Sequence, residues 1–370
     1  MKYYLVAGEA SGDLHGANLM KALKIEDPNT DFRYFGGDKM QAEGGHLVKH
    51  YADMAFMGFT EVVMNLRTIF KNMKACKADI LAYKPDVLVL IDFPGFNLKI
   101  AEFAKKNNIK VCYYISPKIW AWNQKRVLKI KRDVDKMFCI LPFEVDFYKK
   151  WGMDVDYVGN PLLDEKAQFK PDVDFRKNQG LTDQKIIALL PGSRKQEIER
   201  LLPDMLSVTE QFPDYQFVIA AAPTFTADYY RQFIGKKEVK LVFAQTYNLL
   251  QNAHAALVAS GTATLETALF KVPQVVLYRG GAISVGIARL VIKIRFISLV
   301  NLIMDKKVVE ELIQQDCNTQ NIAAHLNKIV EGKERETMLR DYEQLAMLMG
   351  NAGASERTAK LIVKFLTLPL

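Results

Sequence analysis

Short apolar runs alternate with longer amphipathic stretches along most of the chain. In the first half, the apolar runs predict strands at Tyr3–Ala7, Phe32–Phe35, Asp86–Ile91, Val111–Ile115, Met137–Ile140 and Asp156–Val158. The run Asp86–Ile91 is apolar after its first residue and does not alternate, which is typical of a strand buried on both faces of a parallel sheet. Amphipathic stretches such as Leu14–Lys24 and Ile100–Lys106 predict helices between the strands. This order predicts an α/β fold with a doubly wound parallel sheet.

The alternation stops in the polar segment Gln168–Gln184, which we interpret as a linker, and then starts again. The second half predicts strands at Ile186–Leu190, Phe217–Ala220, Val239–Phe243, Ala255–Ala259 and Gln274–Tyr278. We therefore expect two doubly wound domains, residues 1–168 and 169–345, with a ligand site in the cleft between them. Residues 346–370 include a helix with one apolar face, and we expect it to pack back on the first domain.

Composition and charge exclude several classes of protein. Of 370 residues, 49% are hydrophobic and 25% are charged, a balance that excludes a disordered chain. The four cysteines are far apart in sequence, so we expect reduced thiols in a cytoplasmic protein rather than a disulfide framework or a CxxC metal site. The net charge of +8 is compatible with nucleic acid, an anionic membrane or a phosphorylated substrate as partner.

Neither the N-terminus nor any internal segment has the pattern of a targeting or spanning sequence. The first apolar run reaches Glu9 too early for a signal peptide. The longest candidate span, Ile283–Met304, is interrupted by three basic residues. Because a spanning helix needs about 18 or more consecutive apolar residues, we expect the chain not to cross a membrane.

The loop Gly8–Asp13 follows the first predicted strand and opens a helix, where a dinucleotide-binding fold has its glycine-rich turn. Here it contains Glu9 and Asp13, whose carboxylates would repel a pyrophosphate, and this excludes NAD. Carboxylates accept hydrogen bonds from hydroxyl groups, so the loop predicts a site for a sugar. The alternative is that Ser11 or Asp13 only caps the helix.

Asp92 ends the buried strand Asp86–Ile91 and is followed closely by Pro94. A carboxylate at the carboxyl end of such a strand is partly desolvated, which makes Asp92 a candidate general base. The alternative is a turn-forming residue before the proline.

Two loops of the second half carry groups suited to an anion. The loop Pro191–Arg194 contains a glycine, which lets a ligand come close to the backbone. It also contains the Ser193 hydroxyl and the Arg194 guanidinium. Ser260–Glu266 has small hydroxyl residues at a predicted helix N-terminus. Each loop alone is equally a surface turn or a capped helix. Together with the acidic loops of the first domain they predict a sugar nucleotide, with diphosphate on one side and sugar on the other.

Other polar and aromatic groups carry weaker signals. His46 and His50 lack an acidic partner at a metal-ligand spacing, so we expect a surface pair rather than a metal site. Trp120 and Trp122 are either core aromatics or, with the basic stretch Lys125–Arg132, part of a surface for nucleic acid or an acyl-phosphate substrate.

Taken together, these loops resemble lipid-A-disaccharide synthases. The matching motifs are LVAGEASGD at 5–13, MQAEGG at 40–45, MGFTEVV at 57–63, IDFPGFN at 91–97, YYISPKIWAWNQKRV at 113–127, LPFE at 141–144, LPGSRKQEIE at 190–199, ASGTATLE at 259–266 and SLVNLI at 298–303. They occur in the family's order over almost the whole chain. The resemblance implies the GT-B fold, with two Rossmann-like domains facing a central cleft, and neither a metal nor another cofactor.

The resemblance also implies a reaction and its residues. The family transfers 2,3-diacylglucosamine, with inversion, from its UDP derivative to 2,3-diacylglucosamine 1-phosphate, giving UDP and a β-1,6-linked tetraacyl disaccharide 1-phosphate for lipid A. We expect Asp92 to be the base, with Asp13 or Glu9 as alternatives, and Ser11 to lie on the acceptor side. The residues expected to bind UDP are Ser193, Arg194, Ser260, Gly261, Thr262, Glu266 and Asn301.

The segment Met54–Lys77 is rich in Met and Phe and has basic residues on its flank. Its apolar positions predicted to face a membrane or the acyl chains are Phe56, Met57, Phe59, Val63 and Leu66. An apolar face with basic flanks suits an anionic bilayer, so we expect a cytoplasmic protein associated peripherally with the inner face of the cytoplasmic membrane. Burial in the core is the alternative for this segment.

Two other functions compete with the synthase. UDP-sugar 2-epimerases share the two-domain plan but do not require acylated sugars. A non-enzymatic protein that binds RNA or a membrane surface would use the basic stretch Lys125–Arg132. The expected partners are the two acylated sugar substrates and the membrane surface, with no nucleic acid, and the sequence leaves open whether the chain forms a homodimer.

Overall fold

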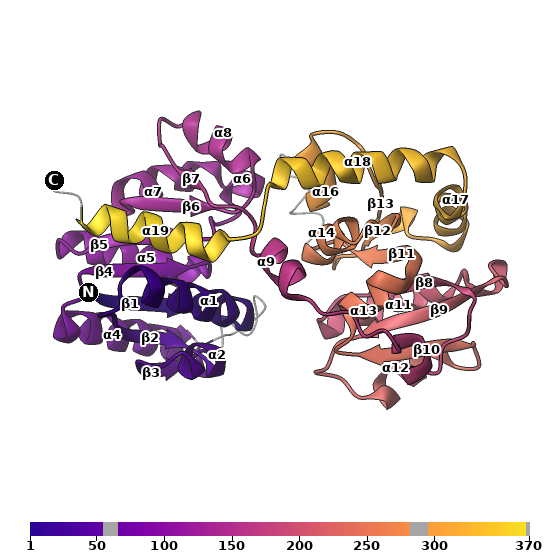
Figure 1. The fold of residues 1–370 in the computed structure, drawn as a ribbon, viewed down its shortest axis with the longest axis horizontal. Coiled ribbons are helices and arrows are strands. Elements are labelled where there is room, and N and C mark those ends of the chain that lie inside the picture. Colours follow the sequence, from indigo (N-terminus) through magenta and orange to yellow (C-terminus); the bar gives the residue numbers. More distant parts are fainter. Residues whose placement is uncertain (55–65, 282–294, 368–370) are drawn as a thin grey trace. The chain divides into compact units, whose positions relative to one another are not determined.

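The computed structural model describes residues 1–54, 66–281 and 295–367, which form two compact units (Figure 1). Unit 1 consists of Met1–Ala167 and Asn351–Leu370, and unit 2 consists of Gln168–Gly350. The chain therefore builds most of the first unit, then all of the second, and returns to the first with its last helix.

The described part of unit 1 has a seven-stranded parallel sheet in the order β3-β2-β1-β4-β5-β6-β7. Its strands are β1 (Lys2–Ala7), β2 (Asp31–Gly36), β3 (His46–His50), β4 (Val87–Ile91), β5 (Lys110–Tyr114), β6 (Lys136–Cys139) and β7 (Asp156–Tyr157). All five residues of the central strand β4 are fully buried. The absence of alternation in its sequence is explained by helices on both faces.

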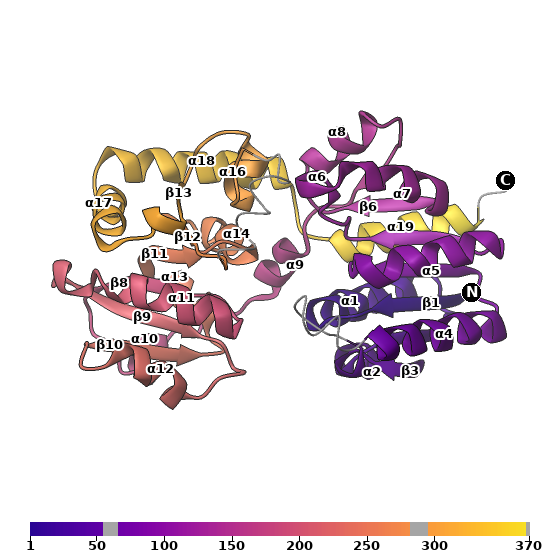
Figure 2. The same cartoon turned by 180° about the vertical axis from the view of Figure 1, so that it is seen from behind.

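The helices of unit 1 are α1 (Ala10–Glu26), α2 (Asp38–Ala42), α4 (Leu66–Tyr83), α5 (Pro94–Lys106), α6 (Ile119–Trp122), α7 (Val127–Asp133), α8 (Phe143–Lys149), α9 (Pro161–Gln168) and α19 (Ala354–Thr367), with 3-10 turns at η1 (Tyr51–Asp53) and η2 (Gln124–Arg126). Helices α1 and α19 cover one face of the sheet, and α4, α5 and α7 cover the other (Figures 1 and 2). This arrangement is the doubly wound fold predicted from the sequence.

Helix α19 packs on unit 1 through its apolar face. Hydrogen bonds at the start of the helix also attach it to this unit. Ala359 and Ile362 are fully buried in the core cluster shared with α1 and the sheet. The Asp164 carboxylate of α9 accepts hydrogen bonds from the backbone N–H groups of Gly353 and Ala354, which caps the helix. Arg357 donates from Nε to the Val158 carbonyl at 2.7 Å.

The described part of unit 2 has a six-stranded parallel sheet in the order β10-β9-β8-β11-β12-β13. Its strands are β8 (Lys185–Leu190), β9 (Tyr215–Ala221), β10 (Val239–Phe243), β11 (Ala253–Ala259), β12 (Gln274–Tyr278) and β13 (Glu310–Ile313). Its helices are α10 (Phe175–Asn178), α11 (Lys195–Leu206), α12 (Ala227–Ile234), α13 (Thr246–Asn252), α14 (Thr262–Leu269), α16 (Leu299–Met304), α17 (Thr319–Val330) and α18 (Lys333–Met349), with turns at η3 (Thr209–Gln211) and η4 (Gln314–Asp316).

The predicted strands are confirmed, but sequence analysis missed the edge strands β3 and β13. Both are short and contain charged residues, so they lack an apolar run. His46 and His50 belong to β3, where they pair with β2, rather than to a helix. A register shift between Leu47 and Lys49 separates them, so that His46 lies beside Arg33 and His50 beside Gly36.

The polar segment predicted as a linker packs against unit 2, which corrects that expectation. Phe175 is 1% exposed and belongs to the core cluster of unit 2. Arg176 donates to the Thr182 carbonyl at 2.6 Å and to Asn252 Oδ1 at 3.3 Å. The pattern failed here because one buried aromatic ring and one arginine hold the segment without any apolar period.

Candidate active site

Three acidic residues lie at the carboxyl ends of the neighbouring strands β1 and β4. They are Glu9, Asp13 and Asp92, and we call them the acidic edge. These strands pair in parallel up to Ala7 and Ile91, so the loops that follow leave the same edge of the sheet. A Cβ added to Gly8 would lie 2.2 Å from the Phe93 ring. The glycine therefore leaves room for this ring, and the two loops interlock.

The backbone around Asp92 adopts a rare conformation. Asp92 and Phe93 have φ angles of 43° and 49°, in the left-handed region. Such residues cost roughly 1–3 kcal/mol each and occur mainly at functional sites. Hydrogen bonds offset this cost: the Asp92 N–H donates to the Tyr114 carbonyl at 3.0 Å, and the Asp92 carbonyl accepts from Tyr113 Oη at 2.6 Å. The end of β4 is thereby held in one conformation.

Asn97, in the first turns of α5, joins the ends of β1 and β4. Its side chain is fully buried, and Nδ2 donates to the carbonyls of Val6 at 3.2 Å, Ile91 at 3.2 Å and Asp92 at 2.8 Å. Sequence analysis gave it no role. The signal that was available is its place on the apolar face of a helix, between the buried residues Phe96 and Ile100.

The Asp92 carboxyl has the electrostatic setting of a base. Burial raises its pKa, and the nearby Glu9 carboxylate raises it further, whereas Lys118 and the Phe93 backbone N–H oppose the rise. A carboxylate with a raised pKa accepts a proton more readily than an exposed one. The role of Asp92 as a base stays a prediction, and a raised pKa is the property that this role requires.

Asp13 supports a neighbouring element. It is 2% exposed, and its two carboxylate oxygens accept hydrogen bonds from the N–H groups of Gly37 at 2.7 Å, Met40 at 3.1 Å and Lys39 at 3.0 Å. These bonds cap α2 and occupy both oxygens. Sequence analysis predicted Asp13 as an alternative base, or Asp13 or Ser11 as the cap of the helix that contains them. The capping prediction is wrong, because α1 has no side-chain cap and Ser11 is exposed in its first turn.

Trp120 and Trp122, the two tryptophans of the loop region after β5, have different surroundings. Trp120 is 7% exposed, and its Nε1–H donates to Glu144 Oε1 at 3.1 Å. Burial raises the pKa of Glu144 to about 7. Trp122 is 47% exposed, and the Arg126 guanidinium lies 4.5 Å from its ring centre. Of these two tryptophans, Trp120 is therefore the core aromatic.

In unit 2, the loops 191–194 and 260–266, which we call the hydroxyl loops, follow the neighbouring strands β8 and β11 at one edge of the sheet. Glu197 Oε2 accepts hydrogen bonds from the N–H groups of Ser193 at 3.2 Å and Arg194 at 3.3 Å. Arg194 is 67% exposed and pairs with Glu197 at 3.7 Å. Such exposed pairs contribute only about 0–1 kcal/mol, so Glu197 holds this guanidinium only weakly.

The second hydroxyl loop presents backbone groups. Gly261 is the N-cap of α14 and provides no side-chain cap, and both Gly261 and Thr262 are exposed. Ser260 Oγ donates to the Ile297 carbonyl at 3.2 Å. Glu266, one turn into the helix, accepts a hydrogen bond from Tyr247 Oη at 3.3 Å. In the first turn of α14, the Thr264 N–H donates to the Gly261 carbonyl at 3.3 Å, and the exposed backbone at Gly261 and Thr262 is suited to an anion.

Asn301 has a different environment from the one expected of a UDP contact. Its side chain is fully buried, Oδ1 accepts from the N–H groups of Val308 at 2.7 Å and Val309 at 2.9 Å, and Nδ2 donates to Glu311 Oε1 at 2.9 Å. Glu311 in turn accepts from the Ser298 N–H at 2.9 Å. Through these bonds the side chain holds the start of α16 and the approach to β13, and a contact with UDP stays a prediction.

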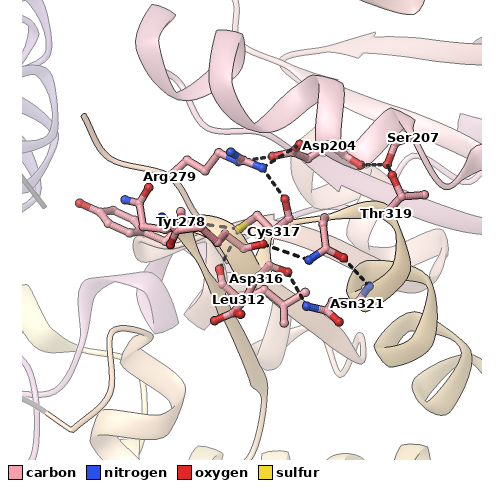
Figure 3. A network of polar contacts seen from close by, with 12 residues as sticks. Asp204, Ser207, Tyr278, Arg279, Leu312, Asp316, Cys317, Thr319 and Asn321 are labelled. Carbon is pink, nitrogen blue, oxygen red and sulfur yellow. Dashed lines mark hydrogen bonds and ion pairs between the residues drawn. The ribbon is translucent and has the colours of Figure 1, made fainter. Parts of the chain in front are cut away.

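A polar network that the sequence did not predict fixes the far end of α11 (Figure 3). Arg279, directly after β12, donates from Nε to Asp204 Oδ2 at 2.5 Å and from Nη2 to the Cys317 carbonyl. Thr319 Oγ1 donates to Ser207 Oγ at 2.8 Å, which ties α17 to the same helix end. Helix α11, which begins beside Arg194, is therefore anchored to the sheet.

Residues 55–65 of the segment Met54–Lys77, which is predicted to meet a membrane, lie outside the described residues. Phe56, Met57, Phe59 and Val63 lie there, and so does the side chain of Leu66, so the prediction for all five stays a prediction. Further along, Phe70 on α4 is 58% exposed. In the described part of the chain, no helix combines the length and apolar character needed to cross a bilayer.

Comparison with known proteins gives a consistent result. The family model described as "Lipid-A-disaccharide synthetase" matches residues 3–365. The lipid-A-disaccharide synthase of Syntrophus aciditrophicus (strain SB) is 42% identical over 364 residues, covering 96% of this chain and 95% of the relative. That of Myxococcus xanthus (strain DK1622) is 39% identical over 370 residues, covering 98% and 97%.

Solved structures share the fold at much lower identity. A UDP-GlcNAc 2-epimerase from Neisseria meningitidis bound to UDP-GlcNAc matches with a TM-score of 0.65 and 15% identity, covering 99% of each chain. The glycosyltransferase of kitacinnamycin matches with a TM-score of 0.68 and 12% identity, also covering 99% of each chain. The fold is therefore GT-B, and the far higher identity to synthases favours these over the epimerases. On these matches the chain belongs to the lipid-A-disaccharide synthase family of glycosyltransferases.

Proposed function

We propose that this protein transfers 2,3-diacylglucosamine from UDP-2,3-diacylglucosamine to 2,3-diacylglucosamine 1-phosphate, with inversion, forming the β-1,6 bond of the tetraacyl disaccharide 1-phosphate. Family membership supports the reaction class and the substrates. The observation that carries the mechanism is Asp92, a carboxyl with a raised pKa held at the end of β4 by a left-handed backbone.

Asp92 acts on the acceptor. A sugar hydroxyl is a poor nucleophile at neutral pH, so a base that takes its proton in the transition state is needed. The acceptor oxygen then attacks the anomeric carbon of the donor from the face opposite UDP, through an oxocarbenium-like transition state. The raised pKa of Asp92 suits this task, and Glu9 lies close enough to tune it. Ser11, exposed beside Glu9, lies on the acceptor side.

The hydroxyl loops act on the leaving group. As the bond to the anomeric carbon breaks, negative charge grows on the β-phosphate of UDP. Arg194 and the free N–H groups at Gly261 and Thr262 stabilise that charge, with Ser193 and Ser260 as neighbouring hydrogen-bonding groups. Glu266 accepts hydrogen bonds from the ribose hydroxyls. Asn301 supports this side indirectly, because its side chain is used within the protein.

The direct test incubates the purified protein with both acylated sugars and measures UDP release together with the disaccharide product. We expect UDP and disaccharide in equal amounts, and neither when the acceptor is left out. Conversion of the UDP-sugar at C2 without an acceptor would instead support the epimerase function. The Asp154→Asn variant, at an exposed aspartate before β7, provides a matched control for changes of Asp92.

We also propose that the protein associates with the inner face of the cytoplasmic membrane through Phe56, Met57, Phe59, Val63 and Leu66. The acylated substrates and the exposed basic residues Arg67 and Lys71 on α4 support this. A variant with Phe56, Phe59 and Val63 changed to Ser should lose binding to anionic vesicles while its melting temperature is retained. A large loss of thermal stability would show that these side chains belong to the core.

A further inference from the structure

Lys118 is the exposed residue of a loop whose other members are buried. It follows β5, and its neighbours Pro117 and Ile119 are both buried. The next residue, Trp120, donates to the buried Glu144 and packs edge-on against Phe143 with ring centres 4.9 Å apart. The position of the Lys118 backbone is therefore set by packing, while its ammonium group is in solvent.

The loop is attached to α8 at a second point. Ser116 Oγ and Tyr148 Oη are 2.9 Å apart, and both side chains are buried. Glu144, which holds Trp120, also accepts hydrogen bonds from the N–H groups of Ile140 at 3.3 Å and Leu141 at 3.0 Å. Fixed contacts on both sides of Lys118 make this loop a stable platform rather than a freely moving turn.

The strand register brings this platform next to the proposed base. Ile91 of β4 pairs with Tyr114 of β5, and the Asp92 N–H donates to the Tyr114 carbonyl at 3.0 Å. Tyr113 Oη donates to the Asp92 carbonyl at 2.6 Å. Lys118 follows only a few residues later, and its charge acts on the Asp92 carboxylate against the effect of Glu9.

Within the described residues, Lys118 makes no ion pair. A cation beside a base has one of two uses, either to stabilise the ionised base or to bind an anionic group of the same substrate. The acceptor in the proposed function carries both a reacting hydroxyl and a phosphate on one sugar ring. A lysine ammonium on a flexible stem suits a phosphate as a point charge.

We propose that Lys118 binds the phosphate of the acceptor sugar while Asp92 accepts the proton of its hydroxyl. This inference rests on the proposed function, which supplies a phosphorylated acceptor. The inference gives unit 1 a specificity for the acceptor. Through Lys118, the enzyme distinguishes a sugar 1-phosphate from the same sugar without phosphate.

The test compares the wild-type enzyme with the Lys118→Met variant on two acceptors, diacylglucosamine with and without the 1-phosphate. Assays are run at a pH well above the acidic limb of the pH–rate profile, where Asp92 is ionised in both proteins. Because hydrogen bonds to charged groups contribute about 1.5–3 kcal/mol, KM for the phosphorylated acceptor should rise roughly tenfold or more. KM for the donor and both constants for the unphosphorylated acceptor should stay unchanged.

Lys149→Met, at an exposed lysine of α8, is the matched control and should behave like the wild type. Lys118→Arg should restore much of the affinity for the phosphorylated acceptor. Equal losses on the two acceptors, or an unchanged KM for the phosphorylated one, would overturn the inference. Calorimetric binding of the two acceptors without donor separates this result from the proposed function: a phosphate-dependent loss on Lys118→Met supports the inference even in an enzyme that releases no UDP.

Discussion

The acidic edge of unit 1 and the hydroxyl loops of unit 2 occupy equivalent places, the carboxyl ends of parallel strands, but they are built differently. In the acidic edge, Asp92 is partly buried on a strained backbone, and Asp13 is 2% exposed with both oxygens bonded. In the hydroxyl loops, Arg194 is 67% exposed and makes a weak ion pair with Glu197.

The difference follows from the chemistry that each edge is proposed to perform. A base needs its pKa set before the substrate arrives, and burial with a neighbouring carboxylate does that. A diphosphate site needs charge and free N–H groups that can be approached, so exposure is an advantage. We therefore expect substitutions at the acidic edge to alter rate and folding stability, and those at the hydroxyl loops to alter nucleotide binding and turnover with little change in stability.

The largest expected effect is on Asp92. Asp92→Asn keeps the shape of the side chain but removes its basicity, so kcat should fall by about 10²-fold or more. Since the folded state raises the pKa of Asp92, the ionised carboxyl costs stability above that pKa, and the amide removes this cost. A melting temperature equal to or above that of the wild type should accompany the loss of activity. Near-normal turnover would show that Asp92 is not the base and would leave Asp13 and Glu9 as the candidates.

Arg194→Ala tests the other side of the comparison. Loss of a charge-assisted contact of about 1.5–3 kcal/mol should weaken UDP binding by roughly ten- to a hundredfold in calorimetry. The melting temperature should hardly change, because the exposed pair with Glu197 contributes little. If UDP binds with unchanged affinity, the guanidinium is not part of the nucleotide site.

Asp13→Ala tests whether Asp13 stabilises the fold or takes part in catalysis. Removing the carboxylate leaves the N–H groups of Gly37, Lys39 and Met40 without an acceptor, which should lower the free energy of unfolding by about 1–3 kcal/mol. Urea unfolding measures this loss. Asp13→Asn retains part of the cap, so it should keep most of the turnover; a loss as large as that of Asp92→Asn would show that Asp13 acts on the substrate.

Gly8→Ala tests the interlocked loops. A Cβ at this position would overlap the Phe93 ring and shift the residue next to Asp92, so turnover should fall by about tenfold, an effect expected of a misplaced catalytic group. Phe93→Ala in the same chain removes the overlap. Recovery of turnover in the double variant, compared with Phe93→Ala alone, would confirm that the overlap is the cause.

The smallest expected effect is a shift of the pH profile by Glu9→Gln. The Glu9 carboxylate raises the pKa of Asp92, so its removal should lower that pKa. Asp92 then stays ionised to lower pH, and the acidic limb of kcat/KM should move to lower pH with little change in the plateau. An upward shift, or a collapse of the plateau itself, would contradict this electrostatic role.

The sequence by itself determined the fold class, most strands and the loops of interest. The run at β4 is apolar because helices bury both of its faces, and this is visible without any partner. The carboxylates in the loop after β1 favoured a sugar over a dinucleotide as ligand. Motifs such as IDFPGFN and LPGSR identified the family because their residues are adjacent along the chain.

Only the tertiary structure decided what individual polar groups do. Asp13 caps a helix that begins some 25 residues later, Asn97 joins β1 to β4, and Asn301 bonds the approach to β13. The edge strands β3 and β13 also depend on their neighbours, since neither has an apolar run of its own. The physical reason is that a hydrogen bond depends on which groups the fold brings within about 3 Å, and sequence patterns report burial rather than pairing.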